Sequence, residues 1–381
     1  MAISMFSNQT SPIAIDFGAA AVKLLQLNPG DPPTIHAAIE IAIPEAIRGD
    51  TNRTLEHLSE KLPKALRLGK FKGKRATCSL PSMRMLLQHM QAPSSGAVSL
   101  DDYINTQLQI QTGALPGALV VRTTHVDDIY RHGGQKAETI CFAIPRDTVM
   151  RHIDLLKRCK LEVTGVHTEQ HAIVWAFEHL CDDEASKAST TLFVDIGWGH
   201  TKSAISHGDK LVFARNIDLG GRHFDEHLAE MLNCDIKSAH AHRMAAIEQM
   251  KPHTKSAATG SAILDTGMSR AVAANSATLA PAKNRDPMGE ALIEILADEL
   301  KMGLRYHNAV FENRRVDRVI FIGGESSNPE LCRSLAERLR IPAQLGDALG
   351  RLGRKGAETN VKLGTPLPGW TVACGLCTGS G

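Results

Sequence analysis

The stretch that decides the fold is Ile13-Ala14-Ile15-Asp16-Phe17-Gly18, an apolar run that ends in Asp-x-Gly. The same pattern returns as Leu192-Phe193-Val194-Asp195-Ile196-Gly197, and a third apolar run, Val319-Ile320-Phe321-Ile322, ends in the pair Gly323-Gly324. A strand of this kind carries an aspartate to the edge of a sheet, and the glycine after it lets backbone N–H groups approach a phosphate closely. One Asp-x-Gly is a weak signal, but three such runs in order predict two domains that hold a nucleotide between them.

Composition indicates a soluble globular protein with more than one domain. The chain has 381 residues, which is too long for one ordinary hydrophobic core. Hydrophobic residues make up 43% of the chain and charged residues 22%, and the net charge is +2. The aromatic content of 4% argues against a stacking platform for single-stranded nucleic acid, so we expect no nucleic-acid partner.

The sequence shows neither a membrane span nor an export signal. A membrane helix needs roughly 20 apolar residues in a row, and no such run is present. Residues 1–11 lack the charged start and apolar centre of a signal peptide. We therefore expect a cytoplasmic protein whose eight cysteines are reduced. Cys374-x-x-Cys377 has no second pair, so plain packing is favoured over a redox or metal role.

Hydrophobic periodicity gives the order of elements in the first half of the chain. Strands at 13–16, 22–27 and 35–43 are followed by a helix over 55–68, in which Pro63 predicts a kink or a break. Between 76 and 165 the pattern changes to that of a compact α+β unit. This unit comprises strands at 76–80, 86–91, 123–129 and 138–144, and helices at 101–112, capped by Ser99, and at 146–159, capped near Asp147.

The second half of the chain begins with a helix over 169–180 that leads to the Asp195 strand. A hairpin through His207-Gly208-Asp209 and a helix over 223–232 come next. Residues 254–283 are rich in Ala, Ser, Thr and Gly, which predicts a mobile insertion. The remaining elements are helices over 288–308 and 329–339, the Val319 strand between them, and an apolar tail at 369–376 that is expected to return to the first domain.

With these parts in order, the chain resembles the actin-like ATPase superfamily and, within it, the PilM family of type IV pilus assembly proteins. The resemblance covers nearly the whole chain. It rests on Ile15-Asp16-Phe17-Gly18, Val22-Lys23-Leu24-Leu25-Gln26-Leu27, Val194-Asp195-Ile196-Gly197 with Thr201, Leu219-Gly220-Gly221-Arg222, Ile322-Gly323-Gly324-Glu325-Ser326 and Trp370-Thr371-Val372-Ala373-Cys374-Gly375-Leu376. The position of the 76–165 insert is shared with the cell-division protein FtsA, whereas Leu80-Pro81, Pro93 and Leu115-Pro116 favour PilM.

The resemblance implies an α/β fold of the actin-like (ribonuclease H-like) type, with two domains and an inserted α+β subdomain called 1C. The implied boundaries are 1–75 and 166–190 for subdomain 1A, 76–165 for 1C, 191–235 and 317–366 for 2A, 236–316 for 2B, and 367–381 for a closing segment of 1A.

The resemblance also implies a site for ATP and Mg²⁺ between the two domains. Asp16 and Asp195 would hold the Mg²⁺ ion through its water ligands, because Mg²⁺ keeps several waters and takes few direct carboxylates. Backbone N–H groups after each aspartate would hold the phosphates, and Glu299 would contact the ribose. The implied nucleotide-binding residues are Asp16, Gly18, Ala19, Ala20, Lys23, Asp195, Gly197, Trp198, Gly199, His200, Thr201, Gly220, Gly221, Glu299, Gly323, Gly324, Glu325 and Ser326.

Two features bear on ATP hydrolysis. The first phosphate loop is Ala19-Ala20-Ala21, where this superfamily usually carries Ser or Thr, and each lost hydroxyl removes about 0.5–1.5 kcal/mol from binding. We therefore expect ATP binding with weak or no hydrolysis. Glu169 stands where superfamily members position the attacking water, which makes it a candidate catalytic residue. It could equally be an exposed acid in a first helical turn, where negative charge is favourable.

In this family the partner is the short cytoplasmic N-terminal segment of a bitopic inner-membrane protein. The resemblance therefore implies a scaffold of a pilus or type II secretion complex, located in the cytoplasm at the inner face of the inner membrane and attached to it only through PilN-like partners. An FtsA-like ATPase and a nucleotide-free degenerate scaffold stay open as alternatives. A small-molecule kinase is less favoured, because no motif for a phosphoryl acceptor is visible. The oligomeric state does not follow from the sequence.

Two histidine motifs offer a different chemistry. His223-Phe224-Asp225-Glu226-His227 matches the inverted pattern of a zinc protease helix. No third ligand is evident, and the preceding Gly220-Gly221 turn already has a place in the actin-like order, so a zinc hydrolase is disfavoured. His240-x-His242 is predicted to be solvated.

Overall fold

The two Asp-x-Gly strands form the centres of two separate sheets in the computed structural model, which describes residues 10–93, 99–131, 134–181, 188–250 and 287–379. In the first sheet, β1 (Ile13–Phe17) pairs antiparallel with β2 (Ala21–Asn28), and β2 pairs with β3 (Thr34–Ala42). Parallel strands β4 (Arg75–Ser79), β8 (Glu162–His167) and β14 (Glu358–Thr359) complete the order β14-β3-β2-β1-β4-β8. This sheet with its helices is called the first lobe below.

The second sheet is built around the Asp195 strand. β9 (Thr190–Ile196), β10 (Thr201–His207) and β11 (Lys210–Ile217) form an antiparallel meander, and β12 (Arg318–Ile322) and β13 (Ala343–Leu345) add parallel strands on the other side of β9. The resulting order is β11-β10-β9-β12-β13. This sheet with its helices is called the second lobe.

Each central strand is buried on both faces, because helices cover the outside of each sheet and a shared cluster lies between the sheets. Alternate residues of a strand face opposite ways, so Ile13 and Ile15 of β1 contact the outer helices α1 (Thr51–Leu68) and α3 (Arg146–Arg158), whereas Ala14 faces inward. In β9, Val194 contacts the outer helices α9 (Pro287–Val310) and α10 (Pro329–Leu339), and Phe193 faces inward.

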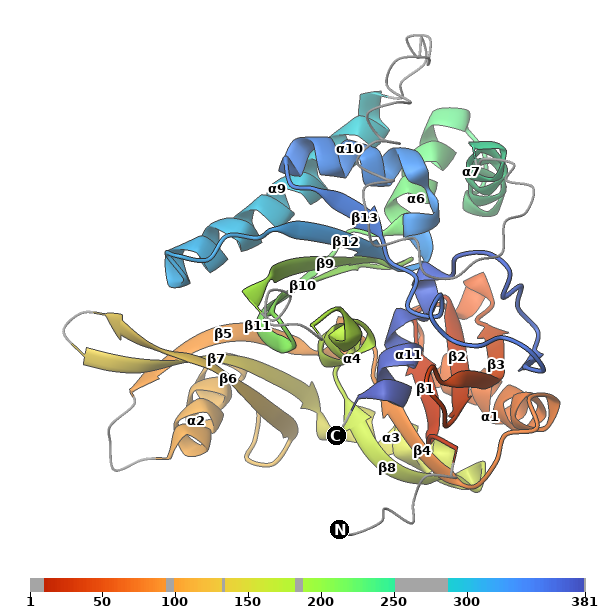
Figure 1. Ribbon diagram of the computed structural model, residues 1–381, viewed down its shortest axis with the longest axis horizontal. Coiled ribbons are helices and arrows are strands. Elements are labelled where there is room, and N and C mark those ends of the chain that lie inside the picture. Colours follow the sequence, from red (N-terminus) through yellow and green to blue (C-terminus); the bar gives the residue numbers. More distant parts are fainter. Residues whose placement is uncertain (1–9, 94–98, 132–133, 182–187, 251–286, 380–381) are drawn as a thin grey trace.

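Two short helices, α4 (Glu169–Ala176) and α11 (Thr371–Thr378), belong to the shared cluster between the lobes (Figure 1). They cross at Gly375, where a Cβ would overlap the backbone carbonyl of Ala172, so only glycine allows this approach. The predicted return of the apolar tail to the first domain is therefore confirmed, since α11 also contacts β1 and β2. Cys374 and Cys377 are free thiols packed in this region.

The insert forms a third sheet of order β5-β7-β6, made of β5 (Leu86–Pro93), β7 (Gly134–Pro145) and β6 (Leu119–Arg131). It extends to one side of the two lobes, with α2 (Leu100–Thr112) against one face (Figure 1). Ser99 caps α2 as predicted, by accepting a hydrogen bond from the N–H of Asp102. The sheet also contacts the second lobe, because the Tyr306 hydroxyl of α9 donates to Glu138 of β7 at 2.5 Å.

Several predicted boundaries differ from the structure. The insert was expected over 76–165, but β4, α3 and β8 pair with or pack on the first sheet, so only 86–145 forms the separate sheet. Likewise, 317–366 was assigned to the second domain, yet β14 pairs with β3. The helix at 55–68 runs unbroken through Pro63, and α3 begins at Arg146 after Pro145, without a cap from Asp147.

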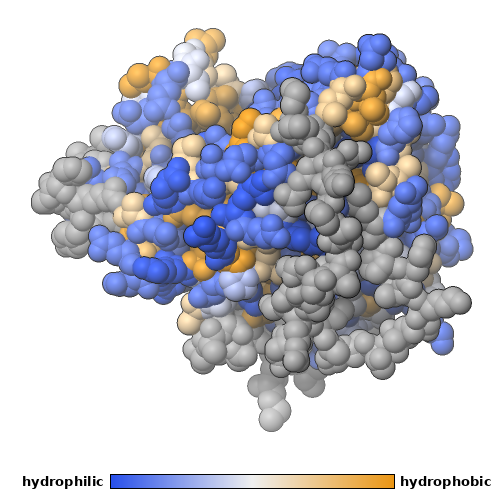
Figure 2. Space-filling view, turned by 90° about the horizontal axis from the view of Figure 1, so that it is seen from above, coloured by the Kyte–Doolittle hydropathy of each residue, from blue (hydrophilic) through white to orange (hydrophobic). Residues whose placement is uncertain are grey.

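The remaining helices, α6 (Gly221–Leu232) and α7 (Ile236–Met250), pack against each other beside the second sheet. The insertion predicted at 254–283 lies outside the described residues. Seen from above, the described surface is mostly hydrophilic, with hydrophobic residues in small separate groups (Figure 2). None of the helices in the described part of the chain is long and apolar enough to cross a bilayer.

Candidate functional site

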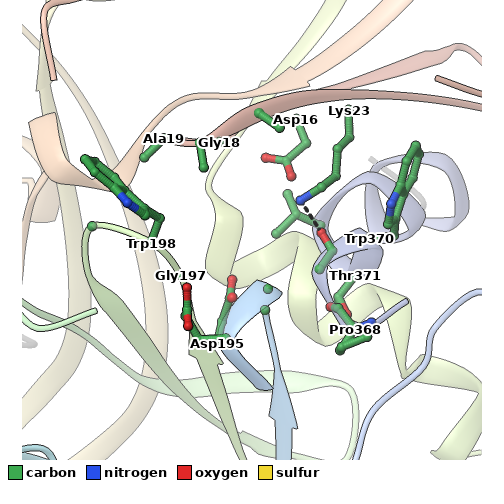
Figure 3. A pocket seen from close by; sticks show the side chains of 18 of the residues that line it. Asp16, Gly18, Ala19, Lys23, Asp195, Gly197, Trp198, Pro368, Trp370 and Thr371 are labelled. Atoms are coloured by element: carbon green, nitrogen blue, oxygen red, sulfur yellow. Dashed lines mark hydrogen bonds between the residues drawn. The ribbon is translucent and has the colours of Figure 1, made fainter. Parts of the chain in front are cut away.

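A cavity of about 340 Å³ lies where the turns of the two central hairpins face each other, within the range of roughly 300–1,000 Å³ typical of small-molecule sites. Figure 3 shows Asp16, Gly18 and Lys23 on one side and Asp195, Gly197 and Trp198 on the other. Both sheets contribute because each central strand ends at the cavity with its aspartate.

Most of the predicted site residues line this cavity. They are Asp16, Gly18, Ala19, Ala20, Lys23, Glu169, Asp195, Gly197, Trp198, Gly199, His200, Gly323, Gly324 and Glu325. Other lining residues were not anticipated: Arg48, Lys202, His240 and the segment 366–372 before and within α11.

Five predicted residues lie outside the lining. The Thr201 hydroxyl donates to the Leu219 carbonyl, and Gly220 and Gly221 lie beneath the second turn, where a Cβ would meet Gly197 or Glu325. Ser326 donates its hydroxyl back to Ile322. Glu299 pairs with Arg215 at 2.6 Å on α9 and β11, so we leave it out of the proposed site.

The two hairpins carry the same pair of charged residues in the same register. Asp16 of β1 lies opposite Lys23 of β2, and Asp195 of β9 lies opposite Lys202 of β10. The two lysines nevertheless bind different groups. Lys23 Nζ donates to the Gly369 carbonyl at 2.6 Å, as the dashed line in Figure 3 shows, whereas Lys202 bonds to carboxylates.

Lys202 is the centre of a buried charge network. Its Nζ lies 2.8 Å from Asp195 Oδ2 and 2.7 Å from Glu169 Oε1, and its side chain is 8% exposed. Burial by itself would lower the pKa of Lys202, but the charges of Asp195 and Glu169 outweigh it and raise the pKa above its ordinary value. Lys202 is therefore a permanent cation in the floor of the cavity.

Glu169, the first residue of α4, is held on both carboxylate oxygens. Oε1 accepts from Lys202, and Oε2 accepts from the Ser82 N–H at 2.9 Å and from the Ser82 hydroxyl. Burial works to raise its pKa, but Lys202 and the other donors outweigh burial, so the pKa is lowered and Glu169 is ionised. The alternative of an exposed acid in the first helical turn is wrong, because Glu169 is 2% exposed.

Asp16 has a different environment from Asp195. Its Oδ1 accepts a hydrogen bond from the Ser79 hydroxyl at 3.0 Å, and no lysine bond to it is present among the described residues. Burial, together with the nearby charge of Glu169, raises the pKa of Asp16 to about 6, although Lys23 and Lys202 oppose the shift.

His200 offers free hydrogen-bonding groups to a ligand. It lines the cavity and is 8% exposed, and neither ring nitrogen has a hydrogen-bond partner within the described part of the chain. Burial, with the charge of Lys202, lowers its pKa, so the ring is neutral at pH 7 and has one donor and one acceptor. Buried polar groups are rarely left unpartnered in a native protein unless a ligand or water satisfies them.

The far side of the cavity is formed by the turn after β12. Gly323 has φ +91°, and a Cβ there would overlap Asp195 Oδ1 and the Ile196 carbonyl, which explains the glycine. Glu325 beside it is paired with Arg243 of α7 at 2.5 Å, and Arg243 also donates to Asp225 at 2.7 Å. Through these two ion pairs, Arg243 ties α6 and α7 to the turn that borders the cavity.

At the mouth of the cavity, one residue of the first lobe contacts one residue of the second lobe. The Arg48 guanidinium of the first lobe lies 4.9 Å from the centre of the Trp198 ring in the second turn. The first turn offers only Ala19 and Ala20 side chains beside Gly18, so any phosphate bound there would be held by backbone N–H groups and by Lys23.

The predicted magnesium site does not fit these donors. Asp195 Oδ2 is already paired with Lys202, and Oδ1 lies against Gly323. An ion shared by Asp16 and Asp195 would have to compete with the Lys202 ammonium for one carboxylate. Within the described ranges, no group of three or more His, Cys, Asp or Glu side chains is arranged to hold a metal ion.

The histidine motifs have structural partners. His223 Nδ1 accepts a hydrogen bond from the Gly220 N–H at the start of α6. Asp225 is engaged by Arg243 and by His240 Nδ1 at 2.9 Å. His242 is exposed, as predicted, whereas His240 is half-buried, because it is held by Asp225 and lines the cavity.

The two lobes, each with a central Asp-bearing hairpin around a common cleft, define an actin-like fold. The solved PilM–PilN type IV pilus biogenesis complex has this fold, with a TM-score of 0.71, 15% identity and coverage of 96% of this chain and 97% of that chain. The ethanolamine utilization protein EutJ from Carboxydothermus hydrogenoformans matches with a TM-score of 0.48 and 13% identity over 97% and 90% of the two chains. An MreB protein of Spiroplasma citri bound to AMPPNP matches with a TM-score of 0.42 and 14% identity over 89% and 92%.

The family model for type IV pilus assembly protein PilM matches residues 14–250. The chain belongs to this family.

Proposed function

We propose that this chain is an ATP-binding scaffold of a type IV pilus or type II secretion assembly complex. The proposal of ATP binding is supported by the cavity between the two Asp-bearing hairpins, whose lining includes Lys23 and the ring of His200, which has no hydrogen-bond partner within the described residues. The phosphates would lie between the Gly18 and Gly197 turns, and the adenosine against Gly323 and Gly324. Membership of the PilM family supports the proposed role in pilus assembly.

Binding without efficient hydrolysis follows from the chemistry of the cavity. A general base or water-orienting residue needs a free carboxylate oxygen directed at the water. Both oxygens of Glu169 are engaged by Lys202 and Ser82, so Glu169 is poorly available for this role. The first turn adds no hydroxyl to the phosphates. The same observations favour a nucleotide-free scaffold as the second candidate, ahead of an FtsA-like ATPase or a small-molecule kinase.

The partner we propose is a PilN-like bitopic protein, whose cytoplasmic peptide docks between the insert and the first lobe. The solved relative is a complex with PilN. The strands that end their sheets there are β6 of the insert, which contacts α3 of the first lobe, and β8 of the first sheet. An edge strand can pair with an extended peptide. Such docking would place the chain in the cytoplasm at the inner face of the inner membrane. A synthetic peptide of the PilN-like protein from the same organism should bind the purified chain.

Filling the cavity tests ATP binding directly. A Cβ at Gly324 would meet no atom within 4 Å, so Gly324→Leu should fold while its side chain occupies the space proposed for adenosine. Calorimetry should show ATP binding by the parent chain and none by this variant. Gly364→Leu is the matched control, because Gly364 also has open space around its Cβ but lies outside the lining. Equal ATP binding by the Gly324→Leu variant, or no binding by the parent, would refute the proposed site.

A further inference from the structure

We propose that the Lys202 ammonium is a built-in cation of the cleft, which stands at the Asp195 and Glu169 carboxylates in place of a divalent metal ion. Only its consequence for nucleotide binding rests on the function proposed above. The inference starts from the difference between the two hairpins: each has an Asp–Lys pair in register, but only Lys202 is inserted between two carboxylates.

The geometry leaves these carboxylates no need of another cation. Lys202 Nζ reaches Glu169 Oε1 at 2.7 Å and Asp195 Oδ2 at 2.8 Å. The second oxygen of Glu169 is held by Ser82, and the second oxygen of Asp195 lies against Gly323. A divalent ion that took Asp195 Oδ2, directly or through a water ligand, would have to displace the buried Lys202 ammonium from one of its two carboxylate partners.

The charges show what the lysine does. Without it, two ionised carboxylates would lie buried near each other and near Asp16, and such like charges repel strongly unless a cation lies between them. A metal ion usually supplies that cation beside a nucleotide. Here the chain supplies it, so a nucleotide should bind with little dependence on Mg²⁺.

The metal response of stability tests the inference without any nucleotide. The melting temperature of the parent should be the same in excess EDTA and in excess MgCl₂. Lys202→Met should melt lower, and MgCl₂ should recover part of the loss because the two freed carboxylates can then bind the ion. Lys23→Met is the matched control from the other hairpin, and its melting temperature should not respond to MgCl₂, since Lys23 is bonded to a carbonyl. A Lys202→Met variant that ignores MgCl₂, or a parent that MgCl₂ stabilises equally, would overturn the inference.

Nucleotide binding by the parent gives a second readout that needs no variant. The dissociation constant for ATP in EDTA should lie within about threefold of that in MgCl₂, whereas a strict metal requirement would change it by more than about tenfold. ATP binding that appears only with MgCl₂ overturns the inference even if Lys202→Met does not fold. Absence of ATP binding under both conditions, together with rescue of Lys202→Met by MgCl₂, would instead refute the proposed function and leave the built-in cation standing.

Discussion

The first and second hairpins of this protein are alike in sequence and register but differ in their chemistry. In both, an aspartate lies opposite a lysine seven positions further on. Lys202 is buried between two carboxylates, whereas Lys23 lines the cavity and bonds to a carbonyl. The difference comes from the neighbours, because α4 brings Glu169 to the second hairpin and the segment before α11 brings Gly369 to the first. Register places a charged side chain, and the elements packed beside it decide its partner.

The largest expected difference between the hairpins is in stability. Lys202→Met should lower the free energy of unfolding by about 3–5 kcal/mol, because it leaves buried carboxylates without their cation. Lys23→Met removes one hydrogen bond to a carbonyl and should cost about 1 kcal/mol. Urea denaturation in EDTA measures both values. Equal losses in the free energy of unfolding would mean that the two lysines stabilise the fold to the same extent, which would contradict the difference drawn between the hairpins.

Asp16 and Asp195 should also contribute differently to stability, and the pH dependence of the free energy of unfolding distinguishes the two contributions. Burial raises the pKa of Asp16 to about 6 from an ordinary value of 3.8, so the folded state holds the Asp16 proton more tightly than the unfolded state. The contribution of Asp16 to the free energy of unfolding is therefore fully present below about pH 4 and is lost as the pH rises through about 6.

Asp16→Asn should consequently raise the free energy of unfolding by about 1–3 kcal/mol above pH 7, and the gain should vanish near pH 4. Asp195→Asn should lower the free energy of unfolding at neutral pH, since it takes a partner from Lys202. Denaturation curves of both variants and the parent between pH 4 and above pH 7 measure these changes in the free energy of unfolding. A gain for Asp16→Asn that is the same at both ends of the range would show that charge on Asp16 is not its cause.

The smallest effect concerns the turns that follow the aspartates. Ala19→Ser and Ala20→Ser should each strengthen ATP binding by about 0.5–1.5 kcal/mol, because a hydroxyl would then face the phosphates. Calorimetry measures the gain, and an unchanged melting temperature shows that the fold is intact. If neither substitution alters affinity, the first turn does not lie on the phosphates or its backbone donors suffice.

Much of this arrangement could be predicted from the sequence, because it depends on local patterns. The apolar run Ile13-Ala14-Ile15 predicted a strand, and the Asp-x-Gly ends predicted which residues meet at the cleft. Boundaries of the insert were missed, because β4 joins the first sheet by pairing with β1 about sixty residues away, and β8 joins it by pairing with β4 more than eighty residues away. Periodicity contains no information on that pairing.

The charge network of the cleft was also missed, although a signal for it was present. Asp16 with Lys23 and Asp195 with Lys202 repeat one spacing, and cross-strand pairing in a tight hairpin places such residues opposite each other. What the sequence could not give is the third partner. Glu169 comes from another element, and the packing of α4 against the second sheet brings it to Lys202, while Ser82 from the turn after β4 holds its other oxygen.

That packing depends on a single position far along the chain. Gly375 lets α11 lie directly on the carbonyl of Ala172, one turn after Glu169 in α4. Any side chain at 375 would act as a wedge that lifts this turn and shifts the Glu169 carboxylate relative to its lysine. Residue 375 therefore affects the geometry of the cleft although it does not line it.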